Sequence, residues 1–329
     1  MQDGAQIEYD YSIAKAFTFA TILFGIIGML IGVILAFQMA FPELNNLAGE
    51  YGTFSRLRPL HTNGVAFGFT LSGIFATWYY IGQRVLKVSL KESPFLMAIG
   101  KLHFVLYFIT ILLAVVTLFM GITTSKEYAE LEWPLDILIT LWWVLWGIGI
   151  FGLIGIRRER TLYISIWYFI ACFLAVAMLH LFNSMAVPTA LYSGYGDWYH
   201  SVSMYAGSND ALVEWWYGHN AVGFVFTVPL VAMIYYFLPK ESGQNVYSYK
   251  LSILAFWGLL FVYLWAGGHH LIYSTVPDWM QTMGSIMSVI LILPSWGSAI
   301  NMLLTMKGEW QQLQTNTLIK FMVLASTFY

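Results

Sequence analysis

Two adjacent imidazoles lie inside a long apolar stretch of this sequence. Residues 248–279 form a run long enough to cross a bilayer, and His269 and His270 lie within it, directly after Gly267 and Gly268. A membrane span excludes ionisable side chains unless they pair with one another or serve a function. We therefore expect the histidine pair to bind a metal ion.

A third histidine reaches the same depth from another apolar run. At ~1.5 Å rise per residue, His219 lies about 13 Å and the pair His269 and His270 about 11 Å below the same membrane surface. Three imidazoles at one level, supplied by antiparallel helices, suit copper, iron or zinc. The other histidines of the apolar runs and loops are interpreted as structural or loop residues: His103, His180 and His200.

Hydroxyl groups follow the histidine pair toward the opposite membrane surface. Tyr263 precedes His270 by seven residues, two helical turns, so its ring is expected on the same face. Ser252 and Ser248 lie further along the same run. These hydroxyls could carry protons to a metal site, or they could bond backbone carbonyls of their own helix, as serine commonly does in membranes.

A second candidate site lies at the start of an earlier apolar run. His61 is preceded by Arg56 and Arg58. An imidazole just inside the membrane can bind haem iron while guanidinium groups neutralise the haem propionates. Arginines at a helix end also fit plain anchoring at the membrane interface.

Carboxylates gather in one connection between apolar runs. They could hold calcium, shape a surface for an electron donor, or form an ordinary solvated loop. The residues concerned are Glu127, Glu130, Glu132 and Asp136.

Eight apolar segments of spanning length must position these side chains. They are 13–40, 60–82, 96–121, 134–156, 162–187, 210–237, 248–275 and 279–306. Each has roughly the ~20 residues that a bilayer core requires. A ninth begins near Asn316, but 318–329 supplies only about half a span, so the chain is expected to be cut short inside a helix. With 59% hydrophobic and 10% charged residues, the 329-residue chain is predicted to be all-α, a transmembrane helix bundle forming a single membrane domain over 1–329.

The distribution of Lys and Arg predicts the orientation of this bundle. Loops 83–95, 157–161, 238–250 and 307–317 carry the excess and are expected in the cytoplasm, together with the N-terminus. The acidic start of the chain is the reverse of a signal peptide, so the first apolar run should remain as a helix. The connection 188–209, rich in Tyr, Trp, Ser and Gly, is expected outside, where it could rest in the interface.

Several classes of protein fit this sequence poorly. The net charge of −2 gives no reason to expect nucleic acid, and the single cysteine, Cys172, excludes an intramolecular disulfide. A multi-helix transporter would be equally apolar, but no inverted repeat or matching pair of broken helices is found. A structural subunit that only anchors haem proteins would not need three histidines at one depth.

These residues resemble the haem-copper oxidases, and more narrowly the catalytic subunit of the cbb3-type cytochrome c oxidases. The resemblance runs from about Tyr9 to the end of the chain. Its motifs are Arg58-Pro59-Leu60-His61-Thr62-Asn63-Gly64, Trp215-Trp216-Tyr217-Gly218-His219-Asn220, and Tyr263 with His269-His270. The resemblance implies a subunit I-like fold of twelve helices, of which about eight would be complete here.

The position of one tyrosine separates the branches of this family. In the mitochondrial-like oxidases, the tyrosine joined to a copper ligand lies four residues after the helix-six histidine, where this chain has Gly223. In the cbb3-type branch it comes from helix seven, as Tyr263 does. Nitric oxide reductases, the nearest enzymatic alternative, lack this tyrosine and add glutamates beside a non-haem iron. Segment 215–225 holds no glutamate, although Glu214 lies just before it.

For the first candidate site, the resemblance implies that three histidines bind the copper called CuB, and these are His219, His269 and His270. Tyr263 would be covalently joined to His219 and would supply an electron and a proton when the O–O bond breaks. Protons would arrive along Ser248, Ser252 and Tyr263.

For the second candidate site, the resemblance implies that His61 is one axial ligand of the low-spin haem b. Arg56 and Arg58 would be propionate partners, and Glu127 and Glu130 fall where the family has carboxylates near a calcium. The family places the ligand of the high-spin haem b, and the second low-spin ligand, on a later Gly-His-Val-His segment. No histidine follows His270, so the polypeptide as written is expected to be an inactive fragment.

The implied activity is that of a terminal respiratory oxidase of the bacterial inner membrane. It would reduce O2 to water with electrons from cytochrome c, relayed by c-type haem subunits on the outer side. Proton uptake from the cytoplasm, with proton translocation, would accompany the reaction.

Overall fold

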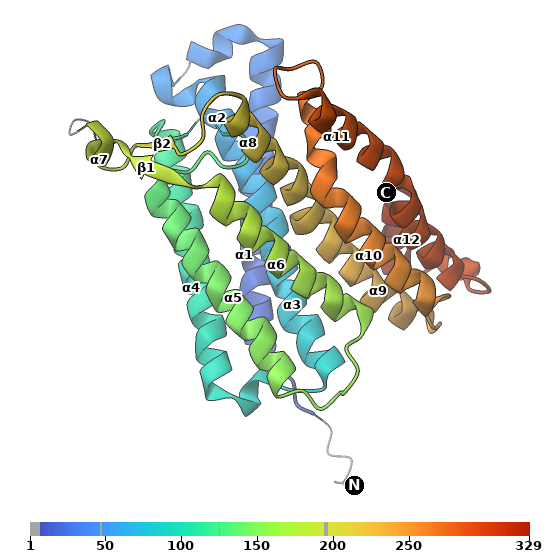
Figure 1. Cartoon of the computed structure of the whole chain (residues 1–329). Helices are drawn as coiled ribbons and strands as arrows, with labels where there is room; N and C mark the ends of the chain where they lie inside the picture. The colour runs from blue at the N-terminus through green and yellow to red at the C-terminus, as the bar shows by residue number, and fades with distance from the viewer. Residues whose placement is uncertain (1–6, 47, 125, 194–196) are drawn as a thin grey trace. The chain divides into compact units, whose positions relative to one another are not determined.

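A computed structural model describes residues 7–46, 48–124, 126–193 and 197–329 of the chain. Its helices and strands are α1 Ser12–Ala40, α2 Phe54–Asn63, α3 Leu71–Leu86, α4 Pro94–Phe119, α5 Trp133–Gly155, α6 Ile164–Asn183, β1 Ala186–Pro188, α7 Thr189–Ser193, β2 Ser201–Ser203, α8 Ser208–Ala221, α9 Val228–Ser242, α10 Tyr249–Ala266, α11 Asp278–Ile290, α12 Ile292–Thr305 and α13 Thr317–Phe328. Figure 1 shows their order along the chain.

The predicted spans are confirmed. Within the described residues, eight helical stretches are long and apolar enough to cross a membrane: Ser12–Ala40, Phe54–Leu86, Pro94–Phe119, Trp133–Gly155, Ile164–Asn183, Ser208–Ser242, Tyr249–Leu271 and Asp278–Thr305. The second begins at Phe54 rather than at residue 60, so Arg56 and Arg58 lie on α2 itself and not in the preceding loop. The chain is a multi-pass, all-α membrane protein.

Polar caps mark where two of the spans begin. The Ser93 hydroxyl accepts a hydrogen bond from Leu96 N at 3.2 Å before α4, and the Ser248 hydroxyl accepts one from Leu251 N at 3.2 Å before α10. Each cap satisfies a backbone N–H that the first helical turn leaves unpaired.

Two spans contain a wider π-helical segment. Gly64–Thr70 joins α2 to α3, and Val222–Thr227 joins α8 to α9. Pro229 explains the second, because proline lacks an N–H and its ring excludes the carbonyl of the residue four positions earlier. Each segment begins three residues after a candidate ligand, His61 or His219, and π segments are frequent at functional sites.

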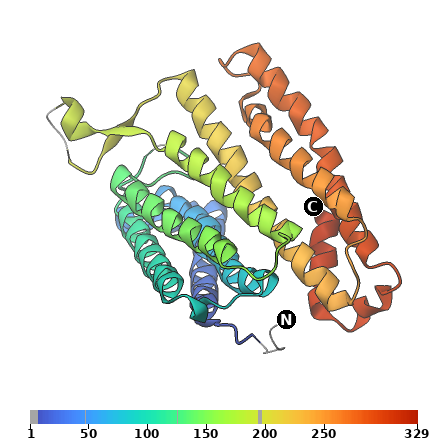
Figure 2. The same cartoon turned by 60° about the horizontal axis from the view of Figure 1, so that its bottom comes forward.

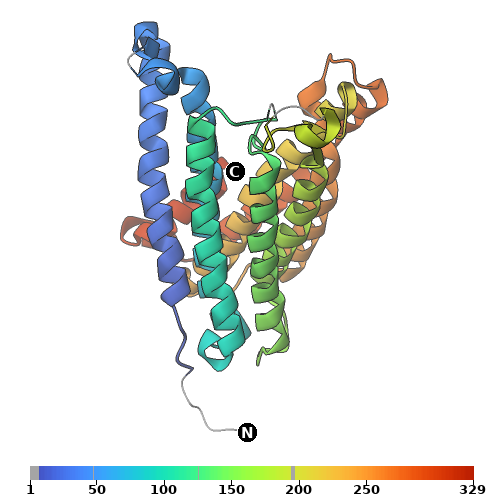
Figure 3. The ribbon, with the colours of Figure 1, turned by 90° about the vertical axis from the view of Figure 1, so that its left-hand side faces the viewer.

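The chain divides into two compact units. The first comprises Met1–Arg160 and His180–Ala206, and the second comprises Thr161–Leu179 and Gly207–Tyr329. In the first unit, α1, α4 and α5 run roughly parallel to one another (Figure 3). In the second, α11 lies along α10 (Figure 2). The single membrane domain over 1–329 stays a prediction.

A small hairpin in the first unit departs from the predicted all-helical pattern. Strands β1 and β2 pair antiparallel, with Ala186 opposite Ser203. The buried Glu132 carboxylate, at the start of α5, accepts a hydrogen bond from Ser201 Oγ at 2.7 Å and lies 3.0 Å from His200 Nδ1. These contacts hold the hairpin at the start of α5. The interfacial location predicted for 188–209 stays a prediction, and its residues 194–196 lie outside the described ones.

Candidate metal centre

His219 lies near the end of α8 in the second unit and is almost completely buried. Its exposed fraction is 9%, and its Nε2 atom has no hydrogen-bond partner among the described residues. Buried polar atoms in proteins are nearly always hydrogen-bonded. An unpaired imidazole nitrogen here therefore fits a metal ligand better than a structural histidine.

His269 and His270 follow directly after α10. The helix ends at Ala266, and Gly267–Leu271 continue as a tight 3₁₀ turn. Two glycines let this turn approach its neighbours closely. A Cβ at Gly267 would lie 2.8 Å from Trp215 O, and a Cβ at Gly268 would lie 2.6 Å from Met280 O. The turn brings both imidazoles to His219.

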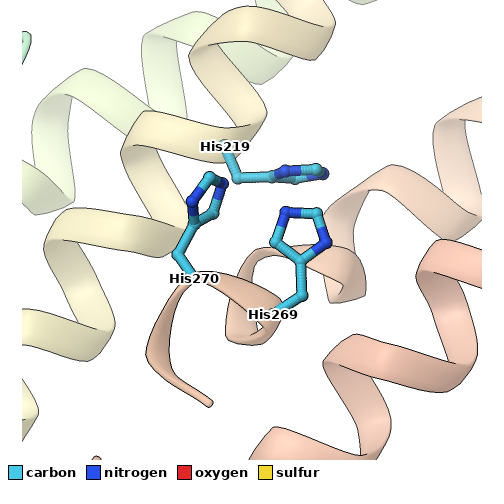
Figure 4. A group of neighbouring side chains, drawn as sticks. All are labelled: His219, His269 and His270. Atoms are coloured by element: carbon cyan, nitrogen blue, oxygen red, sulfur yellow. The ribbon is translucent and has the colours of Figure 1, made fainter.

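The three imidazoles converge on one point (Figure 4). Ring centroids are 4.5 Å apart for His219 and His269, 5.5 Å for His219 and His270, and 4.4 Å for His269 and His270. One nitrogen from each ring lies within 4.8 Å of the others. Imidazoles bind such ions at about 2 Å, which places their nitrogens about 3.5 Å apart, so a small closure would complete the site.

The ligand type favours a particular class of metal. Across the residues that the structure describes, these three histidines are the one group of three or more His, Cys, Asp or Glu side chains arranged to hold an ion. Neutral imidazoles suit copper, zinc, iron or nickel, whereas calcium and magnesium prefer oxygen ligands. The donor set therefore fits copper.

Tyr263 lies beside His219 rather than two turns along a continuous helix from His270. The two-turn spacing assumed one continuous α-helix, whereas α10 ends at Ala266 and Gly267–Leu271 form a 3₁₀ turn. The shared face with His270 stays a prediction. The ring centroids of Tyr263 and His219 are 5.3 Å apart, and the Tyr263 hydroxyl lies 3.3 Å from Thr227 Oγ1. Thr227, the last residue of the π-helical segment, was not predicted from the sequence.

A glycine makes room for this tyrosine. A Cβ at Gly223 would lie 2.6 Å from the ring of Tyr263, closer than real side chains approach. The sequence had already drawn attention to this glycine, because Gly223 occupies the position four residues after His219.

The two serines of the predicted proton path lie in a buried polar cluster. Ser252 Oγ donates to Ser248 O at 3.1 Å and accepts from Asn301 Nδ2 at 2.9 Å. Asn301 Oδ1 accepts from Ser248 N at 2.9 Å, and Asn301 Nδ2 lies 3.3 Å from the Tyr235 hydroxyl. Asn301 and Tyr235 were not predicted, because they come from other helices. Among the described hydrogen bonds, none joins this cluster directly to Tyr263.

In the first unit, His61 is oriented by a backbone carbonyl. Its Nδ1 lies 2.8 Å from Gly28 O on α1. A carbonyl can only accept, so Nδ1 carries the proton and the lone pair of the neutral ring is on Nε2. His61 is therefore able to serve as an axial haem ligand through Nε2.

The arginines and carboxylates predicted around His61 each have protein partners. Arg58 Nη2 contacts Glu127 Oε1 at 2.6 Å, and Arg56 Nη1 donates to Phe119 O at 3.0 Å. The buried Glu130 accepts from Asn63 Nδ2 at 2.9 Å. Burial raises the pKa of the Glu130 carboxyl above its ordinary value. Calcium binding by Glu127 and Glu130 stays a prediction.

The remaining histidines and acidic residues have structural contacts. His103 Nδ1 lies 3.0 Å from the Tyr79 hydroxyl on another helix, and His180 Nε2 lies 3.3 Å from Asp136 O. The same His180 nitrogen lies 3.8 Å from the Asp136 carboxylate, and Glu132 contacts His200, as described above. Each of the four predicted carboxylates thus lies near a different side chain.

Comparison with known proteins connects these features to a family. The family model described as Cytochrome C and Quinol oxidase polypeptide I matches residues 12–329. The chain is 44% identical to the Cbb3-type cytochrome c oxidase subunit CcoN1 of Stutzerimonas stutzeri, covering all of this chain and 67% of that protein. It is 43% identical to Cytochrome c oxidase subunit 1 of Rhodobacter capsulatus, covering 98% of this chain and 59% of that one. The chain therefore spans about two thirds or less of these relatives' lengths.

A solved structure shows the same fold. It is a heme-copper terminal oxidase dimer that is 15% identical in sequence, with a TM-score of 0.67 over 94% of this chain and 55% of that chain.

Proposed function

This chain belongs to the cytochrome c and quinol oxidase polypeptide I family, and on that premise we propose that it acts in the catalytic subunit of a terminal respiratory oxidase. The family predicted from the motifs is thereby confirmed, and its members take haem and copper. The observation that carries the proposal is the convergence of His219, His269 and His270 with Tyr263 packed against His219. The reaction would be reduction of O2 to water with electrons from cytochrome c.

The residues of the second unit fit the copper of such a site. His219, His269 and His270 would hold it, and when bound, copper together with haem would supply the redox chemistry on oxygen. Tyr263 would provide a proton from its hydroxyl, which has Thr227 Oγ1 as a partner at 3.3 Å. Tyr263 and His219 are the pair that would carry the covalent bond known in the family.

Proton delivery and the low-spin haem complete the proposal. Ser248 and Ser252 would carry protons from the cytoplasmic side toward Tyr263, with Asn301 and Tyr235 as further members of the route.

His61 would hold the low-spin haem b through Nε2, with Arg56 and Arg58 near its propionates. Glu127 and Glu130 would hold calcium, and the full subunit would also take a high-spin haem b.

The same proposal covers the partner subunits, the electron donor and the location of the chain. The relatives named as cytochrome c oxidase subunits support other oxidase subunits as partners and cytochrome c as the donor. The partner subunits would carry c-type haem. The chain would lie in a bacterial inner membrane with its N-terminus in the cytoplasm.

A single hydroxyl tests the proposed reaction. In the full-length subunit assembled with its partners, Tyr263→Phe should leave copper content unchanged while oxygen consumption falls by at least about 100-fold, the usual contribution of a positioned proton donor. Tyr273→Phe is the matched control, because Tyr273 is fully exposed in the loop after the histidine pair. If Tyr263→Phe retained its oxygen consumption, Tyr263 would not be the proton donor of the reaction.

A nitric oxide reductase is the alternative within the superfamily. Such an enzyme would need carboxylates beside a second iron, and the three-histidine group includes none among the described residues. The all-imidazole donor set favours the oxidase.

A further inference from the structure

Ser288 lies against one of the three imidazoles. It belongs to α11, and its Oγ lies 2.5 Å from His269 Nδ1 and 2.6 Å from the backbone oxygen of Gly284. Of the three histidines, His269 is the one whose ring nitrogen has a hydrogen-bond partner within the described chain.

The chemistry of the serine hydroxyl determines the direction of both bonds. Serine has one hydroxyl proton, and the Gly284 carbonyl can only accept. The proton of Ser288 therefore goes to Gly284 O, as serine in membrane helices commonly bonds the carbonyl four residues earlier. Oγ is then left to accept from Nδ1–H of His269. The lone pair of the neutral His269 ring is consequently on Nε2, the nitrogen available to a metal.

Close packing holds Ser288 in this position. A Cβ at Gly284 would lie 2.4 Å from His269 N and 2.6 Å from Gly268 C. Only glycine lets the backbone of α11 touch the turn that carries His269. One helical turn further along, the short side chain of Ser288 can then reach the imidazole.

We propose that Ser288 is a positioning residue of the metal centre, which fixes the tautomer and ring orientation of His269 so that Nε2 faces the ion. The proposal rests on the copper-binding role given above to the three histidines. His270 is held differently, by stacking on Trp215 with ring centroids 4.4 Å apart and planes 18° apart. His269 has the hydrogen bond instead.

Loss of the hydroxyl should weaken copper binding. In Ser288→Ala, the Nδ1–H of His269 loses its acceptor, so the ring can rotate or change tautomer. Removing a hydrogen-bond partner of a metal-ligating histidine typically lowers metal affinity about 10–100-fold. We expect this loss without a change in the low-spin haem spectrum, because His61 is not a member of the three-histidine group.

The chain offers a matched control three residues away. Ser285, on the same helix, donates to Gln281 O at 2.9 Å in the same back-bonded geometry, and none of the described hydrogen bonds joins it to a histidine. Ser285→Ala therefore removes an equivalent helix hydroxyl and should leave copper binding unchanged. Ser288→Thr keeps a hydroxyl that can bond the same carbonyl and should restore binding.

The measurement is copper retention by the full-length subunit in its assembled complex, titrated with a copper chelator. The infrared C–O stretch of carbon monoxide on the reduced copper gives a second readout, which should shift in Ser288→Ala only. Equal chelator midpoints and equal C–O stretches for Ser288→Ala and Ser285→Ala would overturn the proposal.

Two further outcomes separate this proposal from the proposed function. If the unsubstituted protein holds no copper, the proposed function fails and this inference fails with it. If Ser288→Ala does not assemble, Ser288→Thr decides: retention of copper supports the hydroxyl's role, and loss of copper from an assembled Thr variant contradicts it.

Discussion

At the scale of single residues, three imidazoles of one centre are held by three different kinds of contact. His269 donates to Ser288, His270 stacks on Trp215, and His219 packs edge-on against His269 with its Nε2 unpaired. None of these three contacts donates a hydrogen bond to a ring nitrogen. A ligand set of this kind keeps one lone pair per ring available to an ion, which a purely structural cluster would not need.

Glu130 offers a pH-dependent test outside the membrane spans. Burial raises the pKa of its carboxyl above the ordinary 4.5, so above pH 4.5 the folded state binds more protons than the unfolded state. Stability should therefore fall as pH rises through the raised pKa. Glu130→Gln keeps an oxygen for Asn63 but cannot ionise. We expect its Tm to exceed that of the unsubstituted protein at neutral pH, and the difference to vanish near pH 4.5.

Thermal unfolding in calcium-free detergent solution measures this difference. A gap in Tm that is the same at both pH values would contradict the ionisation of a buried Glu130. Added calcium should raise the Tm of the unsubstituted protein alone if Glu127 and Glu130 bind it, because a ligand stabilises the state that holds it.

At the scale of elements, the contact between α10 and the π-helical segment Val222–Thr227 positions Tyr263. Gly223→Ala would insert a Cβ 2.6 Å from the tyrosine ring, so the ring must move away from His219 or the helices must separate. Overpacking of this kind costs about 1–3 kcal/mol of stability. We expect a lower Tm and a large loss of oxygen consumption in the assembled enzyme.

Gly155→Ala is the control for this substitution, because a Cβ there meets nothing within 4 Å. Its Tm and activity should stay at the level of the unsubstituted protein. Normal activity in Gly223→Ala would show that the close approach of Tyr263 to His219 is unnecessary.

The elements could be predicted from the sequence to the extent that local chemistry determines them. Span length and apolar composition predicted all eight spans, and Asn316 was placed correctly at the start of the last helix, where its Oδ1 accepts from Leu318 N at 3.0 Å. The π-helical and 3₁₀ segments were missed, because they depend on Pro229 and on packing between helices. Ser288, Thr227 and Asn301 were missed because each contacts a partner on another element, which local sequence patterns do not reveal.

At the scale of the whole molecule, the candidate cofactor ligands belong to two different compact units. His61 and its carbonyl partner Gly28 lie in the first unit, whereas the three-histidine centre lies in the second. The two candidate sites share no ligand among these residues. Metal content and the haem spectrum therefore report on different side chains of one sample.

The most direct test is the copper and haem content of the purified full-length subunit and its His219→Ala variant. We expect one copper per unsubstituted subunit together with haem b, and in His219→Ala the loss of copper with an unchanged low-spin haem spectrum. A second non-haem iron in place of copper, or copper retained without His219, would contradict the three-histidine copper centre.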